Sequence, residues 1–317
     1  MKPAASISLD LDNLWSYLKT QGAPGWESFP GYLDVVVPRI LEVLDRCGQR
    51  ITFFIVGQDA TMESNRAVLR QIADAGHEIA NHSFMHEPWL HLYSRERLHQ
   101  EIGDAEKAIA AVTGKQTRGF RGPGFSTSPL VRDVLAERGY AYDASIFPSA
   151  LGPVARMFFF LNSKLSAEEK AKRQGLYGKF SDAFGTLQPF TWPNGLIEIP
   201  VTTMPLFRVP VHATYLMFLA QKSEALAKAY WGTNIALSRV RGVAPSLLLH
   251  PTDFLDLSDV PQMDFFPGMK VSAAKKCALV EHTVRSLQRH WPTGSMSAVA
   301  AAMPAATPLS TLTTQPA

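Results

Sequence analysis

The chain has 317 residues, of which 46% are hydrophobic and 19% are charged, a composition typical of a globular protein with a large core. Its formal net charge is only +3, from 31 basic and 28 acidic residues, which excludes the strong positive field expected of a nucleic-acid-binding protein. The 2 cysteines do not suggest a disulfide framework, and no apolar run approaches the roughly 18 residues needed to span a membrane.

The two ends of the chain differ in character. The first residues, MKPAASISLDLDN, lack the apolar core of a secretory signal peptide, so we expect a protein of the reducing cytoplasm. The last residues, 297–317, are small, nearly uncharged and rich in Ala, Thr and Pro. Because such a segment cannot build a core, we expect a single domain over residues 1–292 and a disordered tail over residues 293–317.

Short apolar runs typical of buried strands alternate with amphipathic stretches typical of helices. The predicted strands are ISLD (7–10), ITFFIVG (51–57), HEIANH (77–82), RGFR (118–121), LIEIPV (196–201) and SLLLH (246–250). The predicted helices are 32–48, 65–76, 95–114, 126–139, a long stretch at about 213–240, and a last helix at about 272–291. Strands that alternate with helices indicate βαβ units and a parallel sheet, either open or closed into a barrel.

Residues 149–195 interrupt this alternation and are predicted to form a helical insertion, with a capping box at Ser166 and Glu169. Its MFFFL cluster and following basic stretch are typical of a segment that lies on a membrane surface. The same pattern is expected if the aromatic residues pack on the domain and the charges face water. A peripheral membrane contact through residues 154–180 is therefore one of two expectations.

Polar side chains stand at the ends of several predicted strands. In strand order they are Asp10 and Asp12, His82 and His86, Arg121, and His250. Because parallel α/β folds bind ligands at the carboxyl ends of their strands, we expect these side chains to meet at one edge of the sheet.

Each of these residues has an ordinary explanation on its own. A His-x-x-x-His pair is often plain loop, Asp-x-Asp after a strand is often a helix N-cap, and Arg121 and His250 could mark loop and strand ends. Together they form a complete hydrolytic set. Two histidines and a carboxylate make a three-ligand metal site that leaves one position for water, and the remaining carboxylate, arginine and histidine supply a base, an orienting cation and an acid.

The order of motifs Asp-x-Asp, HSFMH, RGPGFS, YDASIFP and LLLHP resembles that of the polysaccharide deacetylases, carbohydrate esterase family 4, also called the NodB-homology domain. The motifs cover residues 10 to 251. This resemblance implies an α/β fold, a distorted (β/α) barrel of about seven parallel strands, and removal of N- or O-acyl groups from sugars with one divalent metal.

The resemblance also implies roles for individual residues. Asp12, His82 and His86 correspond to the metal ligands, and Zn²⁺ is the expected ion, with Co²⁺, Ni²⁺ or Mn²⁺ as alternatives. Asp10 corresponds to the catalytic base, Arg121 to the residue that holds this base, and His250 to the acid.

Four features depart from the usual family pattern. The first motif is spaced, because Leu11 separates its two aspartates. Gly124 stands where an aromatic residue is usual, although its backbone N–H could still stabilise an oxyanion. The fourth motif lacks its tryptophan, and its Asp143 is expected either to contact Arg121 or His250 or to cap a strand. The insertion is not part of the minimal domain.

We therefore expect a metal-dependent hydrolase that removes an acetyl or formyl group from the nitrogen of an amino sugar. Leu248, two residues before His250, is expected to line a small pocket for the acyl methyl group. Without an export signal, the substrate would be a soluble sugar or a lipid-linked glycan at the inner membrane face. Two alternatives stay open: a hydrolase of cyclic amides or ureides, and a catalytically silent glycan-binding protein.

Overall fold

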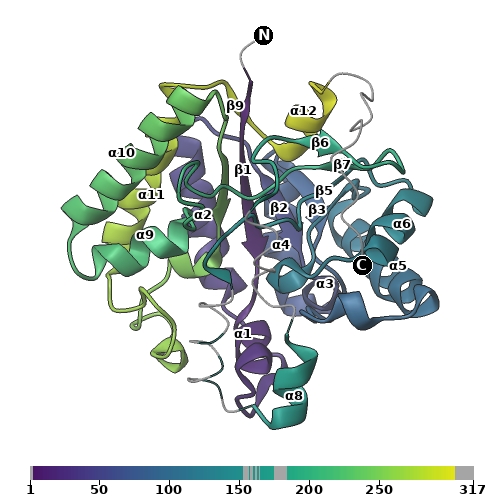
Figure 1. The fold of residues 1–317 in the computed structure, drawn as a ribbon. Coiled ribbons are helices and arrows are strands. Elements are labelled where there is room, and N and C mark those ends of the chain that lie inside the picture. Colours follow the sequence, from purple (N-terminus) through teal and green to yellow (C-terminus); the bar gives the residue numbers. More distant parts are fainter. Residues whose placement is uncertain are drawn as a thin grey trace.

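A curled, mostly parallel sheet surrounded by helices forms the framework of the protein (Figure 1). The computed structural model describes residues 3–152, 165–174 and 184–303, together with Met157, Phe160 and Ser163. The strands follow the order β6-β7-β5-β4-β3-β2-β1-β8, and β9 also pairs with β1. Of the pairings described, β6 with β7 is antiparallel and the others are parallel. The predicted distorted barrel is confirmed.

The strands are short and begin and end as follows: β1 Ala5–Leu11, β2 Thr52–Ile55, β3 Glu78–Asn81, β4 Gly119–Phe120, β5 Tyr142–Asp143, β6 Phe190–Thr191, β7 Ile197–Glu198, β8 Ser246–Leu249 and β9 Thr293–Gly294. The helices are α1 Leu14–Gln21, α2 Leu33–Arg46, α3 Gly57–Thr61, α4 Glu63–Asp74, α5 Arg95–Thr113, α6 Pro129–Glu137, α8 Ala167–Lys172, α9 Ala213–Ala220, α10 Glu224–Arg241, α11 Ala273–Gln288 and α12 Met296–Ala301. In the described part of the chain, no helix is long and apolar enough to cross a membrane.

The alternation of side chains along β1 explains how the sheet carries both a core and a polar site. Every residue of β1 is buried. Ile7, Leu9 and Leu11 belong to the main hydrophobic core, which includes apolar residues of α2 and α4. Successive side chains of a strand point to opposite faces, so Ser8 and Asp10 face the other side, where Arg121 contacts both.

The two edges of the sheet meet through one threonine beyond β7. The Thr202 backbone N–H and hydroxyl both donate to the Ser246 carbonyl, at 3.1 and 2.8 Å, and the Ser246 N–H donates to the Thr202 hydroxyl oxygen at 2.5 Å. Ser246 is the first residue of β8. These bonds join the β7 side of the sheet to β8, and so close the barrel without a regular strand pair.

Most predicted helices lie within a few residues of their expected positions. Ser128 caps α6 with Pro129 at its first position, and Ser166 and Glu169 form the predicted capping box of α8. The long stretch at 213–240 is two helices rather than one, because the chain breaks at residues 221–223 and Ser223 caps α10. The α1 helix was not predicted, since it has only eight residues and so offers little periodicity to detect.

The expected start of the tail at residue 293 is wrong. Residues 293–294 pair with β1 as β9, and α12 follows directly. Met296 is fully buried, and Val299 and Ala300 are nearly so, which places one apolar face of α12 on the domain. The stretch looked like a tail because its apolar residues are mostly alanines, which also occur in unstructured segments. Residues 304–317 lie outside the described residues.

Candidate active site

The polar residues singled out in the sequence converge at the carboxyl ends of the strands. Asp10 lies near the end of β1 and Asp12 just after it, His82 follows β3, and His250 follows β8. Arg121 follows β4 directly. All of these but His250 are at least nine-tenths buried, and His250 is half-buried.

Asp12, His82 and His86 form a cluster able to hold a metal ion. The Nε2 atoms of His82 and His86 lie 3.3 and 3.0 Å from the same oxygen, Oδ1 of Asp12. One ligand atom from each residue lies within 4.8 Å of the others. The cluster is buried, which explains why the three side chains can face one another instead of water.

A strained turn between the two histidines brings them together. Ser83 and His86 adopt positive φ angles of 63° and 50°, which are uncommon for residues other than glycine. The Ser83 N–H donates to the Asn81 side chain at 2.8 Å. The buried carboxylate of Glu101, on α5, accepts from the N–H groups of Phe84 and Met85 at 3.0 and 2.6 Å. Helix α5 therefore holds the turn in shape.

The hydrogen bonds of the cluster suit metal binding. Nδ1 of His82 lies 2.7 Å from the Arg121 carbonyl oxygen and therefore donates to it, which leaves Nε2, directed at Asp12, as the nitrogen that can bind a metal. Burial lowers the pKa of His82, but Asp10 and Asp12 outweigh it and raise that pKa. Burial acts to raise the pKa of Asp12, but the two histidines outweigh it and hold that pKa well below its usual range. Asp12 Oδ1 and His86 Nε2 are buried without a hydrogen-bond partner. A divalent cation would satisfy these atoms, so the residues fit a metal.

Asp10 lies between an arginine and two histidines. Its Oδ1 accepts from Arg121 Nη1 at 2.6 Å, while its Oδ2 lies 3.9 Å from His82 Nε2 and 4.0 Å from His250 Nε2. Arg121 is fully buried and is fixed by further bonds to the Ser8 hydroxyl and the Ala144 carbonyl. One oxygen of Asp10 is thus held and the other is available.

A cavity of about 150 Å³ lies over these residues. Its lining residues are Asp10, Asp12, Tyr17, Thr20, Gln21, His82, His86, Pro88, Gly124, Phe125, His212, Thr214, His250, Phe265 and Phe266. Pockets that enclose a whole drug-sized ligand usually measure about 300–1,000 Å³. The cavity therefore suits one reacting group, with the rest of a larger substrate outside.

An aromatic wall replaces the ring that is absent at Gly124. Gly124 has a φ of 58°, and its neighbour Phe125 lines the cavity and stacks on Phe147, with ring centroids 4.7 Å apart. Leu248 packs beneath this pair with Phe147 and is not among the residues that line the cavity. The sequence singled out Gly124 but missed Phe125, although Phe125 is its direct neighbour.

Asp143 does not contact the catalytic candidates through a hydrogen bond in the described contacts. Its carboxyl accepts from the Ser145 hydroxyl at 2.5 Å and from the Thr127 hydroxyl at 3.4 Å. Its register partner in β7 is Glu198. Burial raises the pKa of Asp143 to about 6, and burial together with the Asp143 charge raises the pKa of Glu198 well above its ordinary value. Asp143 is thus half of a buried carboxyl pair.

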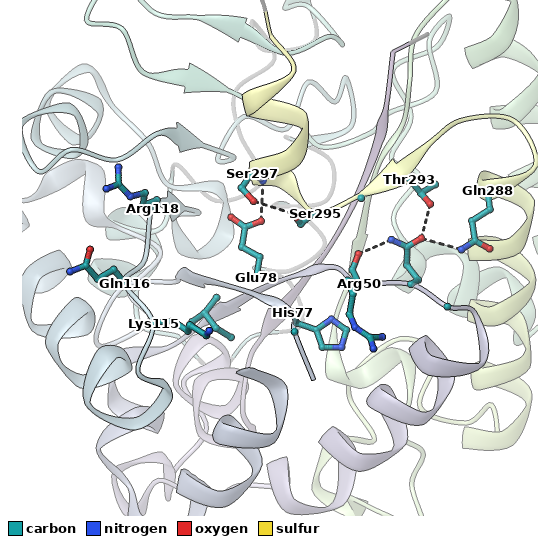
Figure 2. Close-up of a pocket in the computed structure, with 15 residues that line it drawn as sticks. Arg50, His77, Glu78, Lys115, Gln116, Arg118, Gln288, Thr293, Ser295 and Ser297 are labelled. Atoms are coloured by element: carbon teal, nitrogen blue, oxygen red, sulfur yellow. Dashed lines mark hydrogen bonds between the residues drawn. The ribbon is translucent and has the colours of Figure 1, made fainter. Parts of the chain in front are cut away.

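A larger cavity, about 700 Å³, lies at the opposite, amino end of the strands (Figure 2). Figure 2 shows Glu78 near its centre, bonded to Ser297, with Lys115 on one side and Arg50 on the other. The two basic residues follow the ends of α5 and α2, where the helix dipole favours positive charge. Glu78 is already engaged by Thr52 and Tyr142. The carboxyl group of Glu78 thus serves the fold.

Comparisons with known proteins find sequence similarity to one family over part of the chain. Residues 26–142 match the model of the polysaccharide deacetylase family. A peptidoglycan deacetylase-like protein of Gibberella zeae is 35% identical over 115 residues, which are 35% of this chain and 33% of that protein. The peptidoglycan deacetylase of Helicobacter pylori is 25% identical over 155 residues, 47% of this chain and 51% of that protein.

A solved structure from Mycobacterium smegmatis, provisionally described as a polysaccharide deacetylase, has a similar fold. It matches with a TM-score of 0.63 at 21% identity and covers 95% of this chain and 89% of its own. The sequence matches are more limited, because this chain spans about a third to a half of the length of the two curated relatives. The fold thus extends over nearly the whole chain, while the sequence similarity is confined to part of it.

Proposed function

Because the chain belongs to the polysaccharide deacetylase family, we propose that it is a metal-dependent hydrolase that removes an N-acyl group, acetyl or formyl, from an amino sugar. The observation that carries this proposal is the pair of unequal oxygens on Asp10, beside the Asp12, His82 and His86 cluster. A binding protein has no need of a buried base with an arginine on one oxygen and two histidines near the other.

The proposed metal ligands are Asp12, His82 and His86, which fit Zn²⁺ best and would also suit Co²⁺, Ni²⁺ or Mn²⁺. A divalent ion held there would supply a Lewis acid and lower the pKa of a bound water from 15.7 to about 7. The chain supplies the remaining groups, and each has a definite place in the geometry.

Asp10 is the proposed general base, and Oδ2 is the oxygen that accepts the proton of the attacking water. Oδ1 cannot serve, because Arg121 Nη1 occupies it at 2.6 Å. The guanidinium also holds the plane of the carboxyl group. Arg121 is thus a positioning residue whose side chain is buried away from the substrate.

His250 is the proposed general acid. Its Nε2 lies 4.0 Å from Asp10 Oδ2, so the base and the acid can act on the same amide group, one on the attacking water and the other on the leaving nitrogen. As the C–N bond of the amide breaks, the proton on Nε2 passes to the leaving nitrogen. The N–H of Gly124, whose residue lines the same cavity, is the proposed donor to the developing oxyanion.

The decisive experiment combines metal analysis with a screen of N-acyl sugars. His82→Ala and His86→Ala should each lose bound metal and activity together, whereas His290→Ala, which changes a histidine outside the site, should keep both. Full metal occupancy in both site variants would contradict the ligand assignment. Turnover of cyclic amides but not of acyl sugars would favour the ureide alternative, and glycan binding without turnover would favour a silent binding protein.

A lipid-linked glycan in the cytoplasm is the finer proposal for the substrate. Two observations support it: Phe265 lines the cavity and is 44% exposed, and its loop packs at Gly268 against Met217 and Phe218, the latter 49% exposed. The two buried free thiols, Cys47 and Cys277, suit a reducing compartment. Part of the insertion, including Phe158 and Phe159, lies outside the described residues.

Co-sedimentation with anionic vesicles tests this finer proposal. The full chain should bind, and Phe265→Ser should weaken binding, while Val240→Ser on the far helix α10, at a site 83% exposed, should not. Absence of binding by the unmodified protein would point to a soluble substrate.

A further inference from the structure

The two ring nitrogens of His250 lie in different surroundings. Nε2 is on the side of Asp10, 4.0 Å from its Oδ2. Nδ1 is on the protein side, 3.2 Å from Oγ1 of Thr214. A neutral imidazole carries its proton on one nitrogen only, so the partner of Nδ1 decides which nitrogen is protonated.

Thr214 is placed by α9, of which it is the second residue. It is 9% exposed and lines the cavity, yet it does not cap its helix, because His212 occupies the N-cap position. Its hydroxyl can donate one hydrogen bond and accept others. If the hydroxyl proton is donated to another group, the hydroxyl oxygen can only accept a hydrogen bond from His250.

A buried carboxyl group, Asp253, is available to take that proton. Asp253 is fully buried, and its Oδ2 accepts from the backbone N–H of His250 at 2.8 Å. Its Oδ1 is buried without a hydrogen-bond partner at good geometry. Burial raises the pKa of Asp253, while the His250 charge, the His250 N–H, Lys276 and a hydrogen bond from Thr214 act against this rise.

Lys276 supports the ionised form of Asp253. Its ammonium group is fully buried and donates to the carbonyl oxygens of Thr252 and Leu255, at 2.8 and 2.6 Å. A fixed positive charge next to a buried carboxyl group favours the carboxylate, which can only accept hydrogen bonds.

We propose that Thr214 is a positioning residue for His250: its hydroxyl donates to Asp253 and accepts from Nδ1–H of His250, which directs Nε2 to the reacting group. The effect on turnover rests on the proposed function, whereas the arrangement of the hydrogen bonds does not. When Nε2 gives its proton to the leaving nitrogen, Nδ1–H remains, and the imidazolium becomes a neutral ring already held in place. The opposite arrangement, with the hydroxyl donating to Nδ1, would place the proton of the neutral ring on Nε2.

The ring tautomer can be measured without any substrate. In ¹⁵N-labelled full-length protein, long-range ¹H–¹⁵N correlations should identify neutral His250 as protonated on Nδ1. Thr214→Val keeps the shape but removes the hydroxyl, so the proton should move towards Nε2; Thr214→Ser should keep it on Nδ1. Asp253→Asn should also shift the proton. An amide has only one acceptor oxygen, so it cannot accept from both the His250 N–H and the Thr214 hydroxyl. An Nε2-protonated ring in the unmodified protein, or no change in Thr214→Val, would overturn the proposal.

Turnover provides the second readout. Thr214→Val should lower kcat roughly 10–100-fold with little change in KM, since loss of a residue that orients a reacting group typically costs this much. Thr214→Ser should restore most of the rate, and bound metal should be unchanged in both. Thr233→Val, on the exposed side of α10, is the matched control.

An equal loss in the Val and Ser variants would assign Thr214 to packing and contradict the proposal. If the protein lacks deacetylase activity altogether, the proposed function fails, but the tautomer measurement still decides the role of Thr214.

Discussion

At the scale of single residues, the two aspartates of the site differ in the groups that surround their carboxyl oxygens. Asp12 shares one oxygen with two histidines, whereas Asp10 has Arg121 on one oxygen and leaves the other near His82 and His250. The intervening residue of the spaced motif, Leu11, belongs to the opposite, apolar face of β1. Adjacent side chains of a strand point to opposite faces, so an aspartate at position 11 would face the apolar core. The spacing by two avoids this.

Asp10→Asn should separate metal binding from chemistry. The amide keeps the shape of the side chain but cannot accept a proton, so turnover should fall by about 10²–10⁴-fold, the usual contribution of a general base. Metal content, measured by elemental analysis, should stay at the level of the unmodified protein. Near-normal turnover would mean that the base is another residue.

The sequence sufficed to predict the charged and histidine residues that directly follow predicted strands. It did not suffice for residues that only the tertiary packing brings to the site. His82, His86, Arg121 and His250 follow strands whose apolar runs are visible in the sequence. Thr214 and His212 come from the start of α9, more than 30 residues from His250 along the chain, and only the packing of α9 on β8 and the following turn brings them near. No local pattern distinguishes them from other helix-start residues.

At the scale of elements, α5 supports the candidate metal site from outside it. Glu101 accepts the N–H groups of Phe84 and Met85 and is 2% exposed. It thereby holds the turn in which Ser83 and His86 adopt positive φ angles. Without this acceptor, the two N–H groups would lose their partner, and the turn would gain freedom.

Glu101→Ala should therefore weaken metal binding by about 10–100-fold, a cost typical of residues that orient metal ligands. Titration of the metal-free protein with Zn²⁺ measures the effect. Gln100→Ala, an exposed neighbour on the same helix, is the matched control and should bind Zn²⁺ as the unmodified protein does. Equal affinity in the two variants would show that the turn needs no support from α5.

The pairing of β5 with β7 places Asp143 opposite Glu198 and should give the stability of the protein a particular pH dependence. Folding raises the pKa of Asp143 from 3.8 to about 6, so the folded state binds this proton more tightly than the unfolded state. This proton therefore contributes at most about 3 kcal/mol to the free energy of unfolding. The contribution is fully present below about pH 4 and is lost as the pH rises to about 6.

Asp143→Asn should remove this part of the pH dependence, so that the variant gains stability relative to the unmodified protein between pH 4 and 7. Urea unfolding at both pH values provides the measurement. Asp34→Asn, at an exposed position in α2, serves as the control. A constant difference between Asp143→Asn and the unmodified protein at both pH values would contradict the pKa assignment.

The periodicity of the sequence sufficed to predict α2, α4, α5, α6 and α11, because each combines a repeating apolar face with end signals. It did not suffice for β6 and β9, which have two residues each, whereas β4 and β7, equally short, lie inside the longer predicted strands 118–121 and 196–201. A strand of two residues has no alternation to detect, and its pairing is decided by the neighbouring strands. This is also why the sequence placed the end of the domain too early, before β9.

At the scale of the whole molecule, closure of the barrel depends on few bonds. Thr202 makes three hydrogen bonds with Ser246, two of them through its hydroxyl. Thr202 and Ser246 are 8% and 7% exposed, so water replaces these bonds poorly.

Thr202→Val should lower the free energy of unfolding by about 1–3 kcal/mol, because the Ser246 N–H is then left buried without a partner. Thermal or urea unfolding measures this loss, and Thr233→Val, where the hydroxyl bonds within an exposed helix face, should change stability by less. A loss no larger than that of the control would mean that the two sheet edges are joined by packing alone.

The position of β1 has a consequence for how the protein is made. Its neighbours are β2, β8 and β9, so the strand that carries Asp10 pairs with segments from both the early and the late part of the chain. Met296, just beyond β9, contacts Arg121 through its sulfur at 3.7 Å. At a synthesis rate of about 5–20 residues per second, on the order of 15–60 s pass between the translation of β1 and that of β9. During that interval β1 lacks β9 throughout and β8 for most of the time, so the nascent chain must keep a strand of buried residues soluble on the ribosome until its last partners are made.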